Sequence, residues 1–151
     1  HDSLIFGYFG MALNATDGRH TYFRNPVQPA TTVYAYTSMP TAFHGFMSRE
    51  ELAQAEMGRF LGHTYNIPVY KVPQAGRPPF GGVGNPPHRH AGYLDAQGAY
   101  DPHHELYDLR ADPGQERPLA DAAVESAFLD RLRAHLARVQ APTENLLRLG
   151  L

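Results

Sequence analysis

The segment from Glu105 to Asp121, which reads ELYDLRADPGQERPLAD, constrains the fold of this chain more than any other segment. Residues 106–109 favour a short strand, because a large aromatic side chain such as Tyr107 packs well on a pleated sheet. The triplet Asp112-Pro113-Gly114 ends this strand, since proline fixes φ and glycine tolerates positive φ. Asp121 has the short polar side chain of a helix N-cap. The segment therefore predicts a strand, a tight turn and a closing helix.

The closing helix is predicted by a stripe of apolar residues at intervals of three and four. Such spacing places side chains on one face of a helix, with Phe128 and Leu132 in the middle of that face. We expect both residues to be buried against a sheet, and Pro142 to end the helix. The residues of the stripe are Val124, Phe128, Leu129, Leu132, Leu136 and Val139.

Strands are predicted in the N-terminal quarter of the chain. Residues 4–13 are apolar and aromatic, and we expect one buried strand with a bend at one of its glycines. Asp17-Gly18 predicts a hairpin, because this dipeptide suits a two-residue turn. Residues 20–24 would form the second strand of this hairpin, with Tyr22 and Arg24 on one face. A third strand is expected at 31–37, which is β-branched and aromatic.

The middle of the chain is predicted to hold one helix, one strand and one long loop. Ser48-Arg49-Glu50-Glu51 matches a capping box, so we expect a helix from there to about Met57. Residues 67–72 suit a strand, and Pro68 within it predicts an edge position. Residues 73–102 form a long loop rich in glycine, proline and histidine, which is unusual in a compact domain.

These elements together predict a single α+β domain over residues 1–151. The hydrophobic fraction of 42% is that of a globular protein. We expect a small antiparallel sheet of about four strands packed against the C-terminal helix.

Charge and hydropathy exclude two classes of partner. The formal net charge is −2 and no basic stripe is present, which argues against nucleic acid. No apolar run approaches the roughly 20 residues of a membrane helix, so no membrane partner is expected. The chain begins with His1 instead of Met, and we therefore expect it to be a piece of a longer protein. Its localisation stays open for the same reason.

The amino-acid sequences of several segments are more specific than the secondary structure that they predict. The pattern LYDL-x-x-DPG-x-E-x-x-L-x-D before a last helix resembles the C-terminal subdomain of sulfatases, members of the alkaline phosphatase superfamily. Four further segments resemble one sulfatase subgroup or the end of the family. They are LIFGYFG (4–10), NATDGRHTYFR (14–24), YAYTSMPT (34–41) and RLGL (148–151).

This resemblance implies a function for a longer parent protein. In sulfatases a larger N-terminal α/β domain holds calcium or another divalent metal, together with a formylglycine made from a Cys or Ser in a Cys/Ser-x-Pro-x-Arg motif. The present chain contains no cysteine and no such motif. It would therefore be a support and substrate-cleft subdomain of a sulfatase-like hydrolase, inactive alone. The substrate would be a small anionic sulfate, phosphate or phosphonate ester.

The resemblance also implies the partners of this chain. Its main partner would be the N-terminal catalytic domain of the same parent. Without that domain, we expect an exposed face with aromatic residues from the 4–9 strand or the 43–46 loop. The chain could self-associate through that face.

Two histidines are the candidate substrate-cleft residues under the sulfatase interpretation. His44 and His63 could each donate a hydrogen bond to an anionic ester. The alternative for both is an ordinary polar residue packed against the sheet. We assign no catalytic residue and no metal ligand to this chain.

A second interpretation is a free-standing, non-catalytic binding module. Its site would be the histidine-rich loop, which could hold a metal or a sugar. The histidines concerned are His88, His90, His103 and His104. No third ligand is fixed by spacing, so solvated loop histidines are the simpler interpretation. Two other motifs also have simple explanations. Asp108, Asp112 and Glu116 look like a carboxylate cluster, but turn chemistry explains Asp112-Pro113-Gly114 better, so we assign no acid/base pair. The glycosylation triplet Asn14-Ala15-Thr16 is common by chance.

Overall fold

The computed structural model describes residues 3–7, 12–27, 32–42, 45–73 and 103–151. It contains two antiparallel sheets, a small hairpin and three α-helices. The predicted α+β class is confirmed. Residues 74–102, which hold nearly all of the predicted long loop, lie outside the described residues, as does His44. Among the described helices, none combines the length and apolar character needed to cross a membrane.

The first sheet has four strands, the expected number, and their order is β1-β2-β3-β9. They are β1 (Leu4–Gly7), β2 (Leu13–Thr16), β3 (His20–Arg24) and β9 (Glu105–Asp108). The expected hairpin at Asp17-Gly18 joins β2 to β3, and Gly18 has a φ of +85°. The expectation of one strand over residues 4–13 was wrong. The segment forms two antiparallel strands, with Gly7 opposite Leu13.

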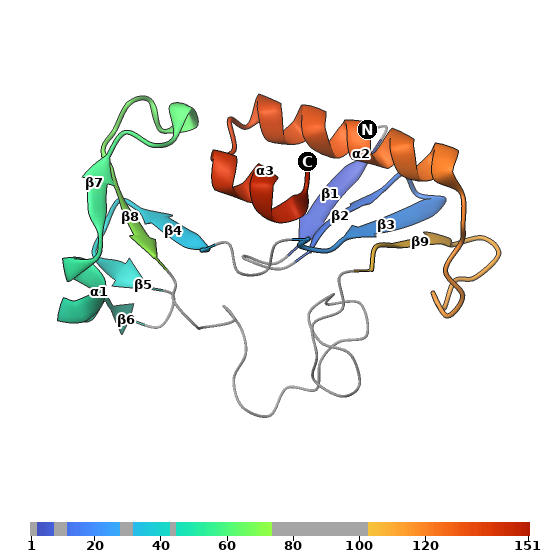
Figure 1. Ribbon diagram of the computed structural model, residues 1–151, viewed down its shortest axis with the longest axis horizontal. Coiled ribbons are helices and arrows are strands. Elements are labelled where there is room, and N and C mark those ends of the chain that lie inside the picture. The colour runs from blue at the N-terminus through green and yellow to red at the C-terminus, as the bar shows by residue number, and fades with distance from the viewer. Residues whose placement is uncertain (1–2, 8–11, 28–31, 43–44, 74–102) are drawn as a thin grey trace.

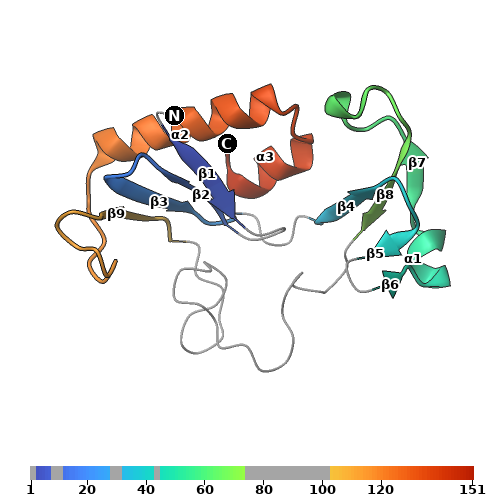
Figure 2. The same ribbon diagram turned by 180° about the vertical axis from the view of Figure 1, so that it is seen from behind.

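Helix α2 (Ala122–Arg138) lies across one face of this sheet, as both ribbon views show (Figures 1 and 2). Asp121 is its N-cap and accepts hydrogen bonds from the backbone N–H groups of residues 123 and 124. Phe128 and Leu132 are fully buried, as their place in the stripe predicted. They form the core together with Ala15, Tyr22 and Leu106 of the sheet. The Tyr22 ring of β3 packs on Phe128 of α2, whereas the neighbouring Phe23 ring contacts Phe6 and Tyr107 of the sheet. Neighbouring side chains of β3 therefore lie on opposite faces, as predicted.

Helix α3 (Thr143–Leu149) follows α2 and was not predicted. Pro142 stands just before it and so separates the two helices. Arg148 and Leu149 of α3 are buried. The helix ends at Gly150, which adopts a left-handed conformation with φ +63°. This is the αL conformation that glycine adopts most easily after a helix.

The second sheet has three strands in the order β4-β8-β7 and stands beside α3 (Figure 1). Its strands are β4 (Tyr34–Thr37), β8 (Val69–Pro73) and β7 (Glu56–Gly58). The predicted edge position of the 67–72 strand is therefore wrong, because β8 lies between the other two. The physical reason is that Pro68 precedes the strand and removes no N–H group from the ladder, while Pro73, which also lacks an N–H group, is only the last residue of the strand.

The remaining elements are short. The hairpin β5 (Thr41–Ala42) with β6 (Gly45–Phe46) precedes α1 (Arg49–Ala53), and the 3-10 helix η1 (Gly62–Thr64) follows β7. The capping box of α1 is confirmed, since Ser48 and Glu51 exchange their side-chain-to-backbone bonds. The helix nevertheless ends well before Met57. No residue of α1 is buried, and residues 56–58 pair with β8 instead.

Candidate functional site

The two most specific motifs of the sequence meet at one corner of the four-stranded sheet. Arg19, from the TDGR segment, donates to Asp108 Oδ2 from Nε at 3.1 Å and from Nη2 at 2.8 Å. Asp108 belongs to the LYDL segment of β9. The Arg19 bond, and then the backbone N–H of Arg110, lower the pKa of Asp108 to about 2. The carboxylate is therefore ionised over the ordinary pH range and holds β9 against the hairpin.

Asp17 organises the hairpin turn at the same corner. Its Oδ1 accepts hydrogen bonds from the backbone N–H groups of Arg19 at 3.0 Å and His20 at 2.7 Å. Its Oδ2 lies 3.6 Å from Arg131 Nη1 on α2. Burial opposes ionisation, but these backbone bonds lower the pKa of Asp17 overall. The side chain thus joins the turn to the helix.

The Asp112-Pro113-Gly114 triplet has the turn role that the sequence predicted. Asp112 Oδ2 accepts from the backbone N–H groups of Glu116 and Arg117, both at 2.7 Å. The backbone N–H of Leu119 then donates to the carbonyl of Leu106 at 2.6 Å, which returns the chain to β9. These turn bonds explain why an aspartate stands at position 112, and no acid or base role is needed for it.

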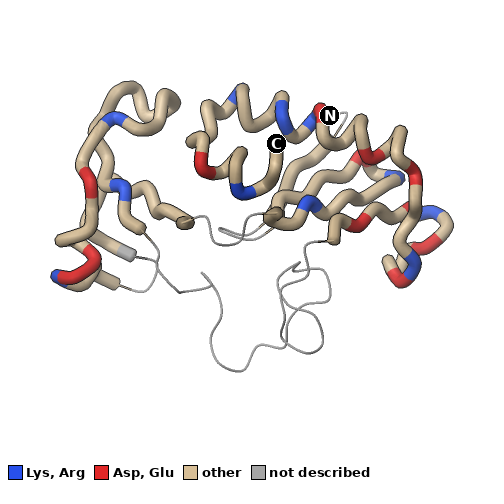
Figure 3. The backbone as a smooth tube through the Cα atoms, in the orientation of Figure 1, with Lys and Arg blue, Asp and Glu red and all other residues tan. Residues whose placement is uncertain are grey.

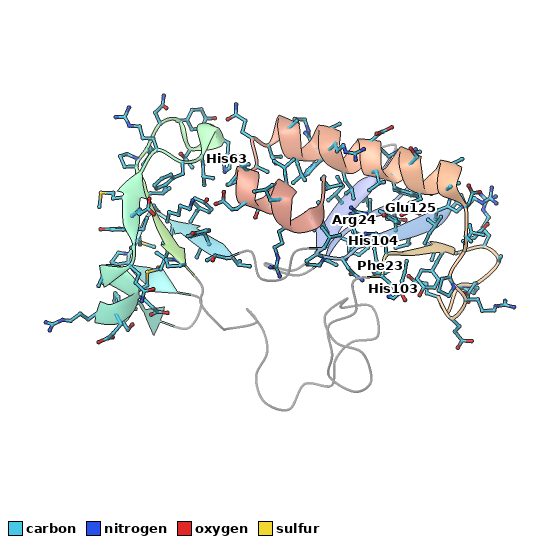
Figure 4. The ribbon with its side chains drawn as sticks, in the orientation of Figure 1. Phe23, Arg24, His63, His103, His104 and Glu125 are labelled. Carbon is cyan, nitrogen blue, oxygen red and sulfur yellow. The ribbon has the colours of Figure 1, made fainter. Side chains whose placement is uncertain are left out.

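A polar cluster lies between the sheet and the helices, around the end of β3 (Figure 4). The Tyr22 hydroxyl donates to Glu125 Oε1 of α2 at 2.9 Å. Burial, with a contribution from Glu125, raises the pKa of Tyr22 to about 12. Arg24 donates to two carbonyls at the end of α3, from Nε to Leu149 O at 2.8 Å and from Nη2 to Gly150 O at 2.9 Å. The Arg24 guanidinium therefore caps α3.

His104 lies beside this cluster, at the start of β9. The backbone N–H of Asn25 donates to its Nδ1 at 3.2 Å, and its ring meets that of Tyr22 edge to face at 6.3 Å. Burial, and then the charge of Arg24, lower the pKa of His104 to about 4. Its neighbour His103 is exposed, and the carbonyl of His103 accepts from the Asn25 side chain. His104 is thus held neutral, with Nδ1 as the acceptor.

His63, one of the two predicted cleft residues, lies in η1 at the end of α2. Its Nδ1 is 3.2 Å from the carbonyl oxygen of Val139, and the side chain is exposed (Figure 4). This contact fits a polar residue that packs one ring edge against a helix end. Its predicted approach to a substrate stays a prediction. His44 lies outside the described residues.

The described residues include only the last two histidines of the proposed binding module, His103 and His104. His88 and His90 lie outside them. The described parts of the chain contain no group of three side chains that could hold a metal ion. The interpretation as a metal or sugar module therefore stays a prediction.

The glycosylation triplet lies within β2. Asn14 is 7% exposed, and Ala15 and Thr16 pair with β3. A modified asparagine must project from the surface, so this burial argues against a glycan on the folded chain.

Two clusters were not singled out from the sequence. One is the capping of α3 by Arg24, and the other surrounds Lys71 on β8. Neither has a local sequence signal, because each joins residues more than 70 positions apart. Acidic and basic residues are interspersed along the described backbone (Figure 3).

Comparison with known proteins identifies no relative. No protein-family model, no curated protein and no solved structure matches this chain.

Proposed function

We propose that this chain is the C-terminal subdomain of a sulfatase-like hydrolase. It would support the catalytic domain of the same parent chain and contribute to the edge of its substrate cleft. The substrate would be a sulfate ester, or a phosphate or phosphonate ester. The chain itself would be inactive, and the intact parent would be the enzyme.

One observation carries this proposal, namely the bond between Arg19 and Asp108. The TDGR and LYDL segments are the strongest parts of the resemblance, and they lie 89 residues apart. In the fold they meet through a charge-assisted bond in which one carboxylate oxygen accepts two donors, and this is a geometrically demanding contact. A chance resemblance in two distant segments would not explain why each supplies one partner of the same contact.

The remaining resembling segments also have defined places. LIFG forms β1, and RLGL supplies the buried end of α3 together with the carbonyl groups that Arg24 caps. YAYT forms β4 of the second sheet. Each segment therefore supports an element of the fold, which is what a support subdomain requires.

The proposed reaction depends on groups outside this chain. The implied metal and formylglycine would belong to the catalytic domain, because this chain has neither a cysteine nor the Cys/Ser-x-Pro-x-Arg motif. The residues proposed to act from this chain are His44 and His63. A histidine N–H can donate to an anionic ester oxygen, and the exposed ring of His63 is open to such a contact.

The reading frame of the parent gene tests the proposal first. We expect the frame to continue upstream of His1 and to encode a Cys/Ser-x-Pro-x-Arg motif. A frame that begins near His1 would contradict the proposal and favour the free-standing binding module.

The role of His63 is tested separately in the intact parent. We expect His63→Ala to raise KM for an aryl sulfate with little change in kcat, because a lost contact to the bound ester weakens binding in the ground state and the transition state alike. His135→Ala is the matched control, since His135 lies on α2 as an ordinary helical residue. Equal kinetics for both variants would remove His63 from the cleft and leave the subdomain assignment intact.

A further inference from the structure

The only lysine in the sequence lies in a cage of aromatic rings. Lys71 is on β8, and its Nζ is 4.2 Å from the ring centroid of Tyr34, 5.6 Å from that of Phe60 and 6.0 Å from that of Tyr36. An ammonium group over aromatic faces is attracted by their negative potential. All twelve other basic residues counted with Lys71 are arginines. The cage thus holds a compact ammonium group instead of a planar guanidinium.

The open side of this cage is closed by α3. Glu144 Oε1 lies 3.2 Å from Lys71 Nζ, and the Tyr36 hydroxyl donates to the same oxygen. The Lys71 and Glu144 side chains are each only 20% exposed, so solvent screens their attraction less than that of a surface pair. Every cage residue except Glu144 belongs to the second sheet or to the segment after β7. The carboxylate is therefore the contribution of the C-terminal helices.

Glu144 is in turn fixed to the first sheet through α3. Arg24 of β3 bonds the carbonyls of Leu149 and Gly150, and the backbone N–H of Val27 donates to the carbonyl of Arg148 at 2.8 Å. A continuous path therefore runs from β3 through α3 and Glu144 to β8. The segment after β7 also meets the end of α2, where His63 Nδ1 lies 3.2 Å from the carbonyl oxygen of Val139 and the Gln140 side chain lies against Gly62.

We propose that the Lys71 cage with Glu144 is a catch that fixes the second sheet against the C-terminal helices. When the catch is closed, the second sheet holds one position beside α3, as in Figure 1. When the ammonium or the carboxylate is neutralised, this sheet moves as a unit while the four-stranded sheet and α2 keep their packing. This inference does not depend on the proposed hydrolase.

The absence of cysteine makes a direct distance measurement possible. Spin labels placed at Met57→Cys on β7 and Ala134→Cys on α2 would report the separation of the two parts. Both positions are exposed. A second pair, Arg110→Cys with Ala134→Cys, lies entirely on the side of the four-stranded sheet and serves as the internal reference. Double electron–electron resonance gives the distance distribution for each pair.

We expect Lys71→Met and Glu144→Gln to broaden the Met57–Ala134 distribution by about twofold, since each removes one charge with little change in side-chain volume. The Arg110–Ala134 distribution should not change. Asp130→Asn is the matched control, because Asp130 pairs with Arg133 at 3.3 Å on the exposed face of α2 and touches neither sheet in that pair. It should leave both distributions unchanged.

Two results would overturn the proposal. If the Met57–Ala134 distribution is the same in the wild type and both variants, the catch does not fix the sheet. If both label pairs broaden together, the contact supports the whole fold and is not a catch between two parts.

Discussion

At the scale of single residues, two glycines show how the resembling segments depend on backbone conformation. Gly150 ends α3 with φ +63°, and a Cβ atom there would lie 2.7 Å from Val27 Cγ2 and 3.1 Å from Arg24 Nη2. Gly18 has φ +85° in the hairpin turn, but a Cβ atom there would meet nothing within 4 Å. The two positions therefore share the conformational requirement and differ in the space around them.

This difference predicts unequal costs for the same substitution. Gly18→Ala should lower the free energy of unfolding by about 1–2 kcal/mol, the cost of the left-handed conformation alone. Gly150→Ala should cost more, because the new methyl group also displaces Val27 and the Arg24 cap. Urea unfolding of both variants measures the two costs. Equal costs would contradict this prediction and would mean that Val27 and Arg24 make room for the methyl group without loss of stability.

His104 gives the folded chain a predicted sensitivity to acid. Burial and Arg24 lower its pKa from 6.5 to about 4 in the folded state, while Glu125 opposes this shift and His103 adds to it. The unfolded chain therefore binds a proton at higher pH than the folded chain. The stability is fully present above the unfolded pKa and is lost as the pH falls toward the folded value.

The expected result is a steeper loss of stability in the wild type than in His104→Gln, which cannot titrate. Urea midpoints at about pH 7.5 and about pH 4.5 measure this loss for each protein. The two proteins share every other ionisable group, so the difference between the two losses isolates His104. A loss of the same size in both would show that His104 is free to protonate in the folded chain.

At the scale of elements, the packing of α2 on the four-stranded sheet holds the core together. Phe128 is 1% exposed, and its ring stacks on that of Tyr22 with centroids 5.9 Å apart. Phe128→Ala should lower the free energy of unfolding by about 3–5 kcal/mol, through lost burial and the cavity that remains. A domain of this size has about 5–15 kcal/mol in total, so the variant should be close to unfolding.

Arg133→Ala is the control on the opposite face of the same helix. Its only described partner is Asp130, in an exposed pair at 3.3 Å, so the change should stay within about 0.5 kcal/mol. Urea unfolding of both variants measures the stability that each face of α2 contributes. Similar shifts for Phe128→Ala and Arg133→Ala would show that α2 does not pack as its periodicity implies.

Local signals in the sequence predicted some elements well and others poorly. The Asp121 cap, the stripe of α2 and the Asp17-Gly18 hairpin were correct, because each is specified by neighbouring residues. Helix α1 was predicted too long, since its capping box is local while the pairing of residues 56–58 with β8 is not. Helix α3 was missed because it is only seven residues long and has no side-chain cap at its start.

The contacts at the candidate sites were harder to predict than the elements. Arg19 and Asp108 were each visible in a motif, but their bond depends on β9 returning to β3 across the rest of the chain. The Lys71 cage draws its residues from β4, β8, α3 and the segment after β7. No spacing rule links such distant positions, so the cage was absent from the sequence-based candidates.

At the scale of the whole molecule, several large apolar side chains are exposed on the part of the chain that contains the second sheet. Phe46 is 87% exposed, Met57 65% and Met39 60%. On β1, Phe6 is also 43% exposed. The expected aromatic residues from the 4–9 and 43–46 segments, as far as they are described, are thus at the surface. Exposed apolar groups of this kind often belong to interfaces.

We therefore predict concentration-dependent self-association of the isolated chain. Phe46→Ser with Met57→Ser should shift the equilibrium toward monomer, while Leu4→Ser on the other sheet should have a smaller effect. Sedimentation velocity over a range of concentrations measures the association. A wild-type chain that stays monomeric at high concentration would contradict the prediction.

The central claim is that this chain supports a catalytic domain and does not itself catalyse. The most direct measurement compares the hydrolysis of nitrophenyl sulfate and nitrophenyl phosphate by the isolated chain and by the intact parent, each with calcium, manganese or zinc. We predict no turnover above buffer for the isolated chain and turnover of at least one ester by the parent. Turnover by the isolated chain, in a preparation free of other hydrolases, would contradict the claim, as would a parent inactive on both esters.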